Sequence, residues 1–538
     1  MNYTTFHRKK YRTGHIGLLL IITVLFVLGY FLQGRTSSGN AKDRHIALMN
    51  QYRPEIHFTP DSMWMNDPNG MVYYNGEYHL FYQYYPNSTV WGPMHWGHAV
   101  SNDLVHWDHL PIALYPDSLG YIFSGSVVVD INNTSGFGSA NQTAMVAIYT
   151  YHNVNGERTG KDNFQTQGIA YSINKGRTWT KYDKNPVLKN PGQRDFRDPK
   201  VNWNKKAGKW IMTLACGDHV CFFSSPDLKN WSFESEFGKN IGAHGGVWEC
   251  PDLFQLPVEE NSSEKKWVLL VSINPGGPNG GSATQYFVGN FDGHRFTNES
   301  TKIKWIDYGK DNYAGVTYSN IPESDSRRIF IGWMSNWQYA QNVPTTPWRG
   351  AMTFPRVLKL TKDADEFSLR SLPVDEIQLL REKKTDVPKR LITPEKPFNF
   401  PIPAKPYPVE ILAEFNIPAS NPASVFGMEL YNDIGEKVIV GFDRQQNRFY
   451  IDRTKSGLND FSNDFAGIHY SGAVNPIQNI DFHLLIDAAS VELFALDGKV
   501  VITEIYFPRK KFDKIRGISA EGNIVLKSGT VYKLTSEK

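Results

Sequence analysis

Short apolar and aromatic runs, separated by turn-forming residues, fill most of the chain. Residues 78–84, 126–129, 144–151 and 267–273 are rich in aromatic or β-branched side chains, and each run has the length of one strand. Glycine, proline, asparagine and aspartate cluster between such runs. Between residues 53 and 356 no long stretch shows the period of an amphipathic helix. The pattern therefore predicts an all-β fold.

A degenerate repeat runs through this region. Residues 101–107, 172–179 and 225–231 are three polar turns, each of which follows a strand pattern and closes on a tryptophan. The copies begin about 71 and 53 residues apart, which is the length of one propeller blade with insertions. The repeat therefore predicts a β-propeller, and its three copies alone do not specify the number of blades.

The C-terminal part has a different pattern. Residues 373–383 form a helix candidate, and the proline-rich stretch up to residue 408 indicates a semi-rigid linker. Alternating strands follow at 409–415 and 437–442, and the pattern at 491–502 predicts a hairpin with an Asp-Gly turn, as in a β-sandwich. The expected division is a basic segment 1–15, an apolar segment 16–32, a stalk 33–50, a propeller 51–360, a linker with a short helix 361–408 and a sandwich 409–538.

The N-terminus has the features of a targeting segment. Basic residues at positions 8, 9, 10 and 12 precede the apolar run 16–32, which has the length of a short transmembrane helix. No small-residue cleavage site follows it closely, so we favour a signal anchor over a cleaved signal peptide. The basic flank would stay inside, which places the remainder of the chain outside the cytoplasm.

Charge and composition narrow the possible ligands. The 57 Lys and Arg residues nearly balance the 54 Asp and Glu residues and are interspersed with them, so the chain lacks the basic footprint of a nucleic-acid-binding protein. Aromatic residues make up 14% of the chain, and their rings suit the apolar faces of sugars. A neutral carbohydrate is therefore the expected ligand. Nothing in the sequence specifies an oligomeric state.

We expect no cofactor and no metal. The three cysteines, Cys216, Cys221 and Cys250, are too few for a disulfide framework and form no CxxC pair. We interpret all three as buried small side chains, with a Cys216–Cys221 pair in an oxidising compartment as the alternative. Three histidines at positions 95, 98 and 106 lie close together in sequence, and we assign them to strand packing rather than to a zinc site.

One stretch, Trp64-Met65-Asn66-Asp67-Pro68-Asn69-Gly70, concentrates polar chemistry in a few residues. Pro68 pushes Asp67 toward an extended backbone, and Asn69-Gly70 is a strong turn signal. We expect a tight turn that holds Asp67 in place. A purely structural turn that leads into a hairpin would account equally well for this stretch taken alone.

Two further motifs indicate a function for this stretch. Together with Arg197-Asp198-Pro199 and Trp248-Glu249-Cys250-Pro251-Asp252, it resembles glycoside hydrolase family 32, the family of invertases, inulinases and levanases. The resemblance runs from about residue 53 to the C-terminus and implies a five-bladed β-propeller followed by a β-sandwich. Residues 64–137 look most like exo-levanases and exo-inulinases.

The resemblance also implies roles for three carboxylates. Asp67 would attack the anomeric carbon, Glu249 would act as the acid and then the base, and Asp198 would bind fructosyl hydroxyls. Two carboxylates of a retaining enzyme lie roughly 5–5.5 Å apart. We expect nearby donors to hold the pKa of Asp67 low, and the apolar neighbours of Glu249 suit a general acid. Arg197 would hydrogen-bond either Asp198 or a sugar oxygen.

Further polar and aromatic residues in the matching motifs are candidates for binding the sugar. They are Asn66, Gln83, Trp91, Phe123, Ser124, Arg197 and Trp337. Asp307 and Asp311 are additional candidates for lining the same funnel.

The leading hypothesis is an exo-acting, retaining β-fructosidase that removes terminal β-D-fructofuranosyl units from levan, inulin and sucrose. A fructosyltransferase would use the same covalent intermediate and pass the fructosyl unit to a sugar. A non-catalytic fructan-binding propeller is the alternative from another class, and the presence of all three carboxylates argues against it. The preference for β-2,6 or β-2,1 linkages stays open.

Overall fold

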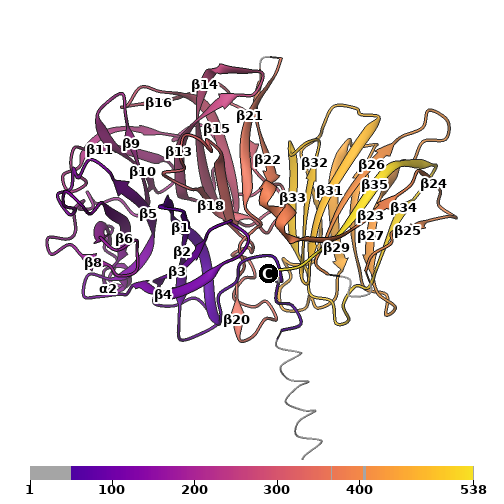
Figure 1. Ribbon diagram of the computed structural model, residues 1–538, viewed down its shortest axis with the longest axis horizontal. Helices are drawn as coiled ribbons and strands as arrows, with labels where there is room; N and C mark the ends of the chain where they lie inside the picture. Colours follow the sequence, from indigo (N-terminus) through magenta and orange to yellow (C-terminus); the bar gives the residue numbers. More distant parts are fainter. Residues whose placement is uncertain (1–49, 365, 404–406, 537–538) are drawn as a thin grey trace, which may run out of the picture. The chain divides into compact units, whose positions relative to one another are not determined.

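The computed structural model describes residues 50–364, 366–403 and 407–536, and strands dominate these ranges (Figure 1). The helical elements among the described residues are α2 (Val154–Arg158) and the 3₁₀-helix η1 (Asp375–Leu380). The prediction of an all-β fold is thus confirmed. Within these ranges no helix is long and apolar enough to cross a membrane. The apolar segment 16–32 and the expected anchor lie outside the described residues.

Four antiparallel-rich sheets form the N-terminal part. The first contains β20 (Trp348–Arg349), β1 (Met63–Tyr74), β2 (Glu77–Tyr85), β3 (His95–Ser101) and β4 (Asp108–Leu114). The second contains β5 (Tyr121–Asp130), β6 (Ala144–His152), β7 (Gln165–Ser172) and β8 (Thr180–Lys181), and the third contains β9 (Phe196–Asn204), β10 (Lys209–Cys216), β11 (Val220–Ser225) and β12 (Ser232–Phe237). The fourth contains β13 (Val247–Val258), β14 (Asn261–Asn274), β15 (Ala283–Phe291), β16 (Phe296–Asn298), β17 (Lys304–Trp305), β18 (Tyr313–Thr317), β19 (Arg328–Trp333), β21 (Arg356–Asp363) and β22 (Glu366–Pro373).

The sequence repeat corresponds to one connection in each of the first three sheets. Each copy starts at the last residue of the third strand and leads to the fourth, and its serine hydroxyl donates to the side-chain oxygen two positions later. The pairs are Ser101–Asp103 at 3.1 Å, Ser172–Asn174 at 2.9 Å and Ser225–Asp227 at 3.1 Å. The repeat therefore marks equivalent turns.

A β-bulge interrupts the first strand of each sheet. The pairing slips between Met65 and Pro68 in β1, between Ile122 and Gly125 in β5, between Arg197 and Lys200 in β9, and between Glu249 and Asp252 in β13. A bulge breaks the strict alternation of a strand and can re-aim a side chain. Proline is tolerated at such places because the ladder there lacks a partner for an N–H group. The bulges therefore provide a common way to turn motif residues out of the sheets.

The tight turn expected at Asp67 is not formed. Residues 63–74 are one continuous strand, and Gly70 sits at a second bulge with φ of +57°. A Cβ atom at this glycine would lie 2.7 Å from the Phe81 ring. Pairing with β2 over most of the stretch outweighs the local turn preference of Asn69-Gly70, which is accommodated as a bulge instead.

Two further sheets face each other across an apolar core and form the C-terminal sandwich. One contains β23 (Arg381–Val387), β24 (Arg390–Ile392), β26 (Val409–Asn416), β31 (Asn479–Asp487), β32 (Ser490–Ala495), β33 (Val500–Ile505) and β35 (Ile524–Leu534). The other contains β25 (Phe398–Asn399), β27 (Val425–Tyr431), β28 (Lys437–Asp443), β29 (Arg448–Lys455), β30 (Ile468–Tyr470) and β34 (Lys514–Ser519). The predicted hairpin at 491–502 is confirmed as β32 and β33.

The stretch 361–408 differs from the expected linker with a short helix. The helix is only the 3₁₀ turn η1, and the chain continues directly into β23, which pairs with β35. β24 also pairs with β35, and β25 pairs with β34. Strand pairing with residues more than a hundred positions later thus incorporates the proline-rich stretch into the sandwich, an effect that local composition does not reveal.

A buried ionic network joins the two β-domains. We call His57, Asp307, Arg356, Asp487 and Glu492 the junction cluster. Arg356 is fully buried and donates to Asp307 at 2.9 Å and to Glu492, while His57 bridges Asp487 and Glu492 at 2.8 Å each. Every carboxylate in the cluster therefore has a cationic or imidazole partner.

Candidate active site

All ten predicted site residues line one cavity of about 260 Å³. Six of them come from the bulged strands β1, β5 and β9, Glu249 comes from β13, and Gln83 comes from β2. Trp91 follows β2 and Trp337 follows β19. Motifs that lie far apart in sequence are thus brought to a single hollow because the first strands of neighbouring sheets contact one another.

Asp67 is the buried carboxylate that the first motif provides. Its Oδ1 accepts from the Asn66 amide at 2.9 Å, and its Oδ2 accepts from the Ser124 hydroxyl at 3.1 Å. The Trp64 indole donates to the oxygen of Asn66 at 2.7 Å, which turns the amide NH₂ toward Asp67. These contacts hold one orientation of the carboxylate.

The expected low pKa of Asp67 is wrong. Burial, followed by the negative charge of Glu249, raises the pKa of Asp67 to about 6, although Asn66 and Ser124 hydrogen-bond the ionised form. Two neutral donors do not replace the water that a buried carboxylate loses, and no cation of the described residues contacts it directly. Asp67 is therefore ionised at neutral pH and protonated in moderately acidic solution.

Asp198 shares this environment. Burial raises its pKa to about 7, with Glu249 and Asp67 adding to the effect and Arg197 opposing it. Its Oδ2 accepts from the backbone N–H of Cys250 at 3.0 Å. The Cys250 sulfur lies 3.7 Å from Asp67 Oδ2 and 3.6 Å from Asp198 Oδ2, and burial raises the pKa of this thiol, so it stays protonated between the two carboxylates.

Glu249 is held differently from the other two carboxylates. Arg197 donates to its Oε1 from Nη2 at 3.0 Å and from Nε at 3.3 Å, and the Tyr313 hydroxyl donates to its Oε2. Arg197 also binds Asp195 at 2.6 Å, whereas its Nε is 3.9 Å from Asp198. Burial opposes the guanidinium charge, but the carboxylates around it raise the pKa of Arg197. Arg197 thus orients Glu249 rather than chiefly Asp198.

Aromatic side chains form walls of the cavity. Trp337 stacks on Trp64 with ring centroids 5.9 Å apart, and Trp91 meets Phe123 edge-on at 6.0 Å. Gln83 is 3% exposed, and its Nε2 has no hydrogen-bond partner among the described residues. A pocket with rigid apolar walls and a free amide donor is suited to a sugar ring with its hydroxyls.

Sequence reasoning missed several residues of the site. Asp195, His152, Glu157, Phe164 and Gln165 also line the cavity. Asp195 lies two positions before Arg197, so its place near the motif could have suggested it. The other four flank or belong to the connection between β6 and β7, which no motif marks. Asp307 and Asp311, expected in the funnel, lie instead in buried ion pairs with Arg356 and Arg453.

Cys216 and Cys221 form a disulfide, so their interpretation as separate buried thiols is wrong, while Cys250 is free and buried. The disulfide closes the turn between β10 and β11. In that turn, Gly217 accepts from the N–H of Trp248 at 2.7 Å and donates to the carbonyl of Asp195 at 2.9 Å. The turn therefore contacts the backbone beside both Glu249 and Arg197.

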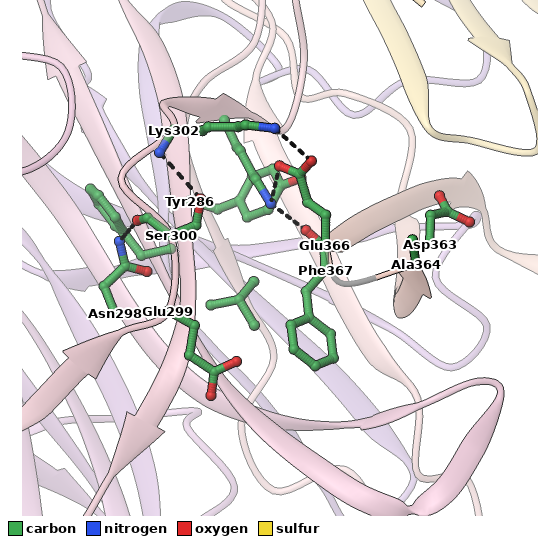
Figure 2. Close-up of a pocket in the computed structure, with 12 residues that line it drawn as sticks. Tyr286, Asn298, Glu299, Ser300, Lys302, Asp363, Ala364, Glu366 and Phe367 are labelled. Atoms are coloured by element: carbon green, nitrogen blue, oxygen red, sulfur yellow. Dashed lines mark hydrogen bonds and ion pairs between the residues drawn. The ribbon is translucent and has the colours of Figure 1, made fainter. Parts of the chain in front are cut away.

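Another hollow, of about 440 Å³, lies between β15, β22 and the residues around β16. Figure 2 shows Lys302 reaching Glu366, an ion pair of 2.8 Å. Glu299 pairs with Lys266 at 2.6 Å, and Asp363 pairs with Lys499. Each carboxylate there is neutralised by a lysine, so this hollow lacks the closely spaced, unevenly partnered acids of the first cavity.

Comparison with known proteins agrees with this geometry. The family model for the glycosyl hydrolases family 32 N-terminal domain matches residues 57–372, and the model for the glycosyl hydrolases family 32 C terminal matches residues 376–533. The chain belongs to glycosyl hydrolase family 32. The N-terminal sheets of this family 32 chain thus form a β-propeller, and the C-terminal sheets form its β-sandwich.

Family 32 relatives extend over most of the chain. It is 46% identical to a levanase of Bacillus subtilis over 96% of this chain and 74% of the levanase. It is 38% identical to an extracellular exo-inulinase of Aspergillus niger over 90% of this chain and 95% of that protein. A fructofuranosidase from Schwanniomyces occidentalis, solved in complex with fructose, superposes with a TM-score of 0.82 at 35% identity, covering 90% and 99% of the two chains.

Proposed function

We propose that this protein is an exo-acting, retaining β-fructosidase that hydrolyses terminal non-reducing β-D-fructofuranosyl residues of fructans, such as levan and inulin, and of sucrose. The observation that carries the proposal is the presence of Asp67 and Glu249 in one cavity with different partners. Asp67 has neutral donors only, whereas Glu249 is held by a guanidinium and a phenol. The levanase, exo-inulinase and fructofuranosidase relatives support this substrate class.

Asp67 and Glu249 have different roles in the proposed reaction. Ionised Asp67 attacks the anomeric carbon while Glu249 gives its proton to the departing oxygen, so that the glycosidic bond breaks as a fructosyl ester forms. Glu249 then takes a proton from water, which attacks the same carbon and releases fructose and free Asp67. Asp198, Asn66, Gln83 and Ser124 are proposed to bind the fructosyl hydroxyls.

The shape of the cavity supports action at chain ends. Trp64 and Tyr313, which contact the polar residues of the site, are fully buried, and Cys250 is 3% exposed. The hollow therefore ends at Asp67 instead of continuing past it as an open groove. A terminal fructosyl unit can enter such a pocket, whereas an internal unit would need room for chain on both sides.

We infer five blades for the propeller. The fourth sheet joins its two halves through a single residue pair, Val258 with Leu360, between β13 and β21. β18 carries a bulge between Tyr313 and Val316 like the first strands of the other sheets. Contacts also run from β1 to β5, β9, β13 and β18 in turn, and from β18 back to β1. A closed ring of five inner strands accounts for these contacts.

We further infer that the protein acts outside the cytoplasm, attached to the membrane through residues 16–32. The basic residues before this apolar run, the disulfide between Cys216 and Cys221, and the extracellular exo-inulinase relatives support this location.

Product analysis of the full-length protein with levan, inulin and sucrose tests the function. Free fructose is expected as the main early product, and the Asp67→Ala variant should release none. Growth of longer fructo-oligosaccharides from sucrose would identify a fructosyltransferase instead. Binding of fructan without turnover of any of the three substrates would show that the propeller only binds.

A further inference from the structure

The β6/β7 hairpin carries polar groups that the reaction described above does not use. Its last cross-strand pair is His152 with Gln165, and residues 153–164 form the connection beyond it. Both residues line the active-site cavity, together with Glu157 of the connection. The His152 ring lies flat on Phe123, with centroids 4.2 Å apart and planes 7° from parallel. The pair is therefore firmly placed at the cavity wall.

The hydrogen bonds of this pair have only one consistent direction. His152 Nε2 is 3.1 Å from a carboxylate oxygen of Glu157, and His152 Nδ1 is 3.2 Å from Gln165 Nε2. A carboxylate only accepts, so Nε2 must carry the proton, and Nδ1 of the neutral ring must then accept from the glutamine NH₂. Burial lowers the pKa of His152 to about 4, which keeps the ring neutral. Glu157 thus sets the tautomer of His152, and His152 sets the orientation of the Gln165 amide.

This orientation leaves one acceptor unused. Gln165 is 2% exposed, and its Oε1 has no hydrogen-bond partner within the described part of the chain. Most buried side-chain oxygens in proteins are satisfied, and an exception calls for an explanation. Because Gln165 lines the cavity, a hydroxyl of a bound ligand would supply the missing hydrogen bond.

The hairpin lies beside the strand that carries Arg197. Thr150, two cross-strand pairs before His152 and Gln165 and on the same side of β6, accepts from the N–H of Asp198 at 3.0 Å. Gln167 donates to the carbonyl of Phe196 at 2.9 Å, and the Arg194 guanidinium lies 5.6 Å above the Phe164 ring. The unused acceptor is therefore on the side of residues 194–198.

The same side is where the departing sugar must lie. Glu249, held by Arg197, has to reach the glycosidic oxygen in order to protonate it, so the group attached to that oxygen extends from Glu249 toward the mouth of the cavity. In the proposed reaction the fructosyl ring lies instead against Asp67, which accepts hydrogen bonds from Asn66 and Ser124. Gln165 is thus placed to meet the leaving group.

We propose that Gln165 is a binding residue of the leaving-group subsite, where its Oε1 accepts a hydrogen bond from a hydroxyl of the departing sugar. His152 and Glu157 are positioning residues that fix the Gln165 amide. The inference rests on the proposed function and deepens it. Because the transfer step is the reverse of bond cleavage with a different alcohol, a sugar that accepts the fructosyl unit occupies the same subsite.

Two substrates with different leaving groups test the subsite. Sucrose releases glucose, which has hydroxyls that can reach Gln165. Methyl β-D-fructofuranoside releases methanol, whose single hydroxyl contains the former glycosidic oxygen, so no further hydroxyl is present to bind Gln165. In the Gln165→Leu variant, kcat/KM for sucrose should fall about tenfold, the effect of one neutral hydrogen bond, while kcat/KM for the methyl fructoside stays within twofold of wild type. Fructosyl transfer to added sucrose, relative to hydrolysis, should fall as well.

A second variant tests the hydrogen bonds from Glu157 through His152 to Gln165 without altering the buried amide itself. Glu157→Ala replaces a partly exposed side chain and removes the acceptor that sets the His152 tautomer. It should reduce kcat/KM for sucrose about threefold to tenfold, with the methyl fructoside again unaffected, and it should not lower the melting temperature. A loss on sucrose alone, with an unchanged melting temperature, would not arise from general damage to the fold.

The outcomes separate this inference from the proposed function. Equal losses on both substrates in Gln165→Leu, or unchanged activity on both in both variants, would overturn the leaving-group subsite while the β-fructosidase assignment stands. Absence of fructose release from either substrate by the wild-type protein would overturn the proposed function itself, and the subsite with it.

Discussion

The active-site cavity and the junction cluster both bury carboxylates, but the pKa values of these carboxylates shift in opposite directions. In the cavity, the pKa values of Asp67 and Asp198 are raised to about 6 and about 7. In the junction cluster, burial alone would also raise the pKa of Glu492, but Arg356 and His57 lower it to about 2. The pKa of Asp487 is lowered as well, by His57 and backbone N–H groups. The difference lies in the partners, not in the depth of burial.

This difference implies opposite contributions to stability. Glu492 stabilises the fold above pH 4.5, and that contribution is lost as pH falls toward 2. For Asp67 the folded pKa exceeds the usual 3.8, so its contribution is fully present below pH 3.8 and is lost as pH rises through 6. At neutral pH the junction therefore stabilises the protein, while the site holds a destabilising charge that the proposed reaction requires.

The largest expected effect comes from Asp67→Asn, which removes the nucleophile but keeps its shape. The value of kcat for fructose release should fall by a factor on the order of 10⁴ to 10⁶, as for the loss of other nucleophiles. Steady-state release of fructose from sucrose measures this loss. A decrease of less than tenfold would contradict the nucleophilic role.

The same Asp67→Asn variant should be more stable than wild type, by about 2–3 kcal/mol above pH 7 and by almost nothing at pH 4. The matched control Asp487→Asn should lose stability, because it breaks an ion pair with His57. Denaturant unfolding at several pH values measures both. A stability gain in the control, or none in Asp67→Asn at pH 8, would remove the contrast between the two regions.

Glu492→Gln should destabilise the protein by about 3–5 kcal/mol, because it leaves buried Arg356 with Asp307 as its remaining carboxylate partner. The exposed pair of Glu414 with Lys527 provides the control, and Glu414→Gln should change stability by less than about 1 kcal/mol. Thermal unfolding compares the two. Equal melting temperatures for the two variants would mean that the junction cluster contributes little.

Activity should fall on the acidic side because Asp67 must be ionised to attack. Below pH about 6, kcat/KM is expected to decrease about tenfold per pH unit, as Asp67 gains a proton that Glu249 and burial favour. A profile of kcat/KM for sucrose between pH 4 and 8 measures this decrease. A decrease that begins only near pH 4 would show that the pKa of Asp67 is not raised in solution.

The smallest effect concerns the disulfide beside the site. Replacing Cys216 and Cys221 with serine should free the turn whose Gly217 contacts Asp195 and Trp248. We expect kcat to fall twofold to tenfold and stability to fall by about 2 kcal/mol, the entropy of a short loop. Kinetics and urea unfolding of the double variant measure these losses. Wild-type kcat in the double variant would exclude a positioning role for the turn.

Much of the site could be predicted because its chemistry is local in sequence. Asp67, Asp198 and Glu249 each lie in a short motif with a proline, and Asn66 and Arg197 are found in the same motifs. Many strands could be predicted too, since short aromatic and β-branched runs between turn residues favour the β conformation over a helix. The hairpin of β32 and β33 is the clearest case, because its Asp-Gly turn is formed by neighbouring residues.

Errors arose where distant pairing decided the structure. Asn69-Gly70 forms a bulge within β1 because β2 pairs over most of the stretch. Segments of residues 381–399 form strands because they pair with β34 and β35. Gln165 and His152 carry no motif, so their place beside Arg197 could not be read from the chain. The disulfide likewise depends on a turn geometry that spacing alone left open.

By itself the sequence indicated the all-β fold, the two β-domains in series and, through the family resemblance, three candidate acids, because period, turn residues and short motifs are properties of neighbouring positions. Only the tertiary structure decided which acids keep a proton. A pKa depends on burial and on charges that come from other sheets, such as Glu249 for Asp67 and Arg356 for Glu492. The same kind of residue is therefore a proposed reactive group in the cavity and a stabilising one at the junction.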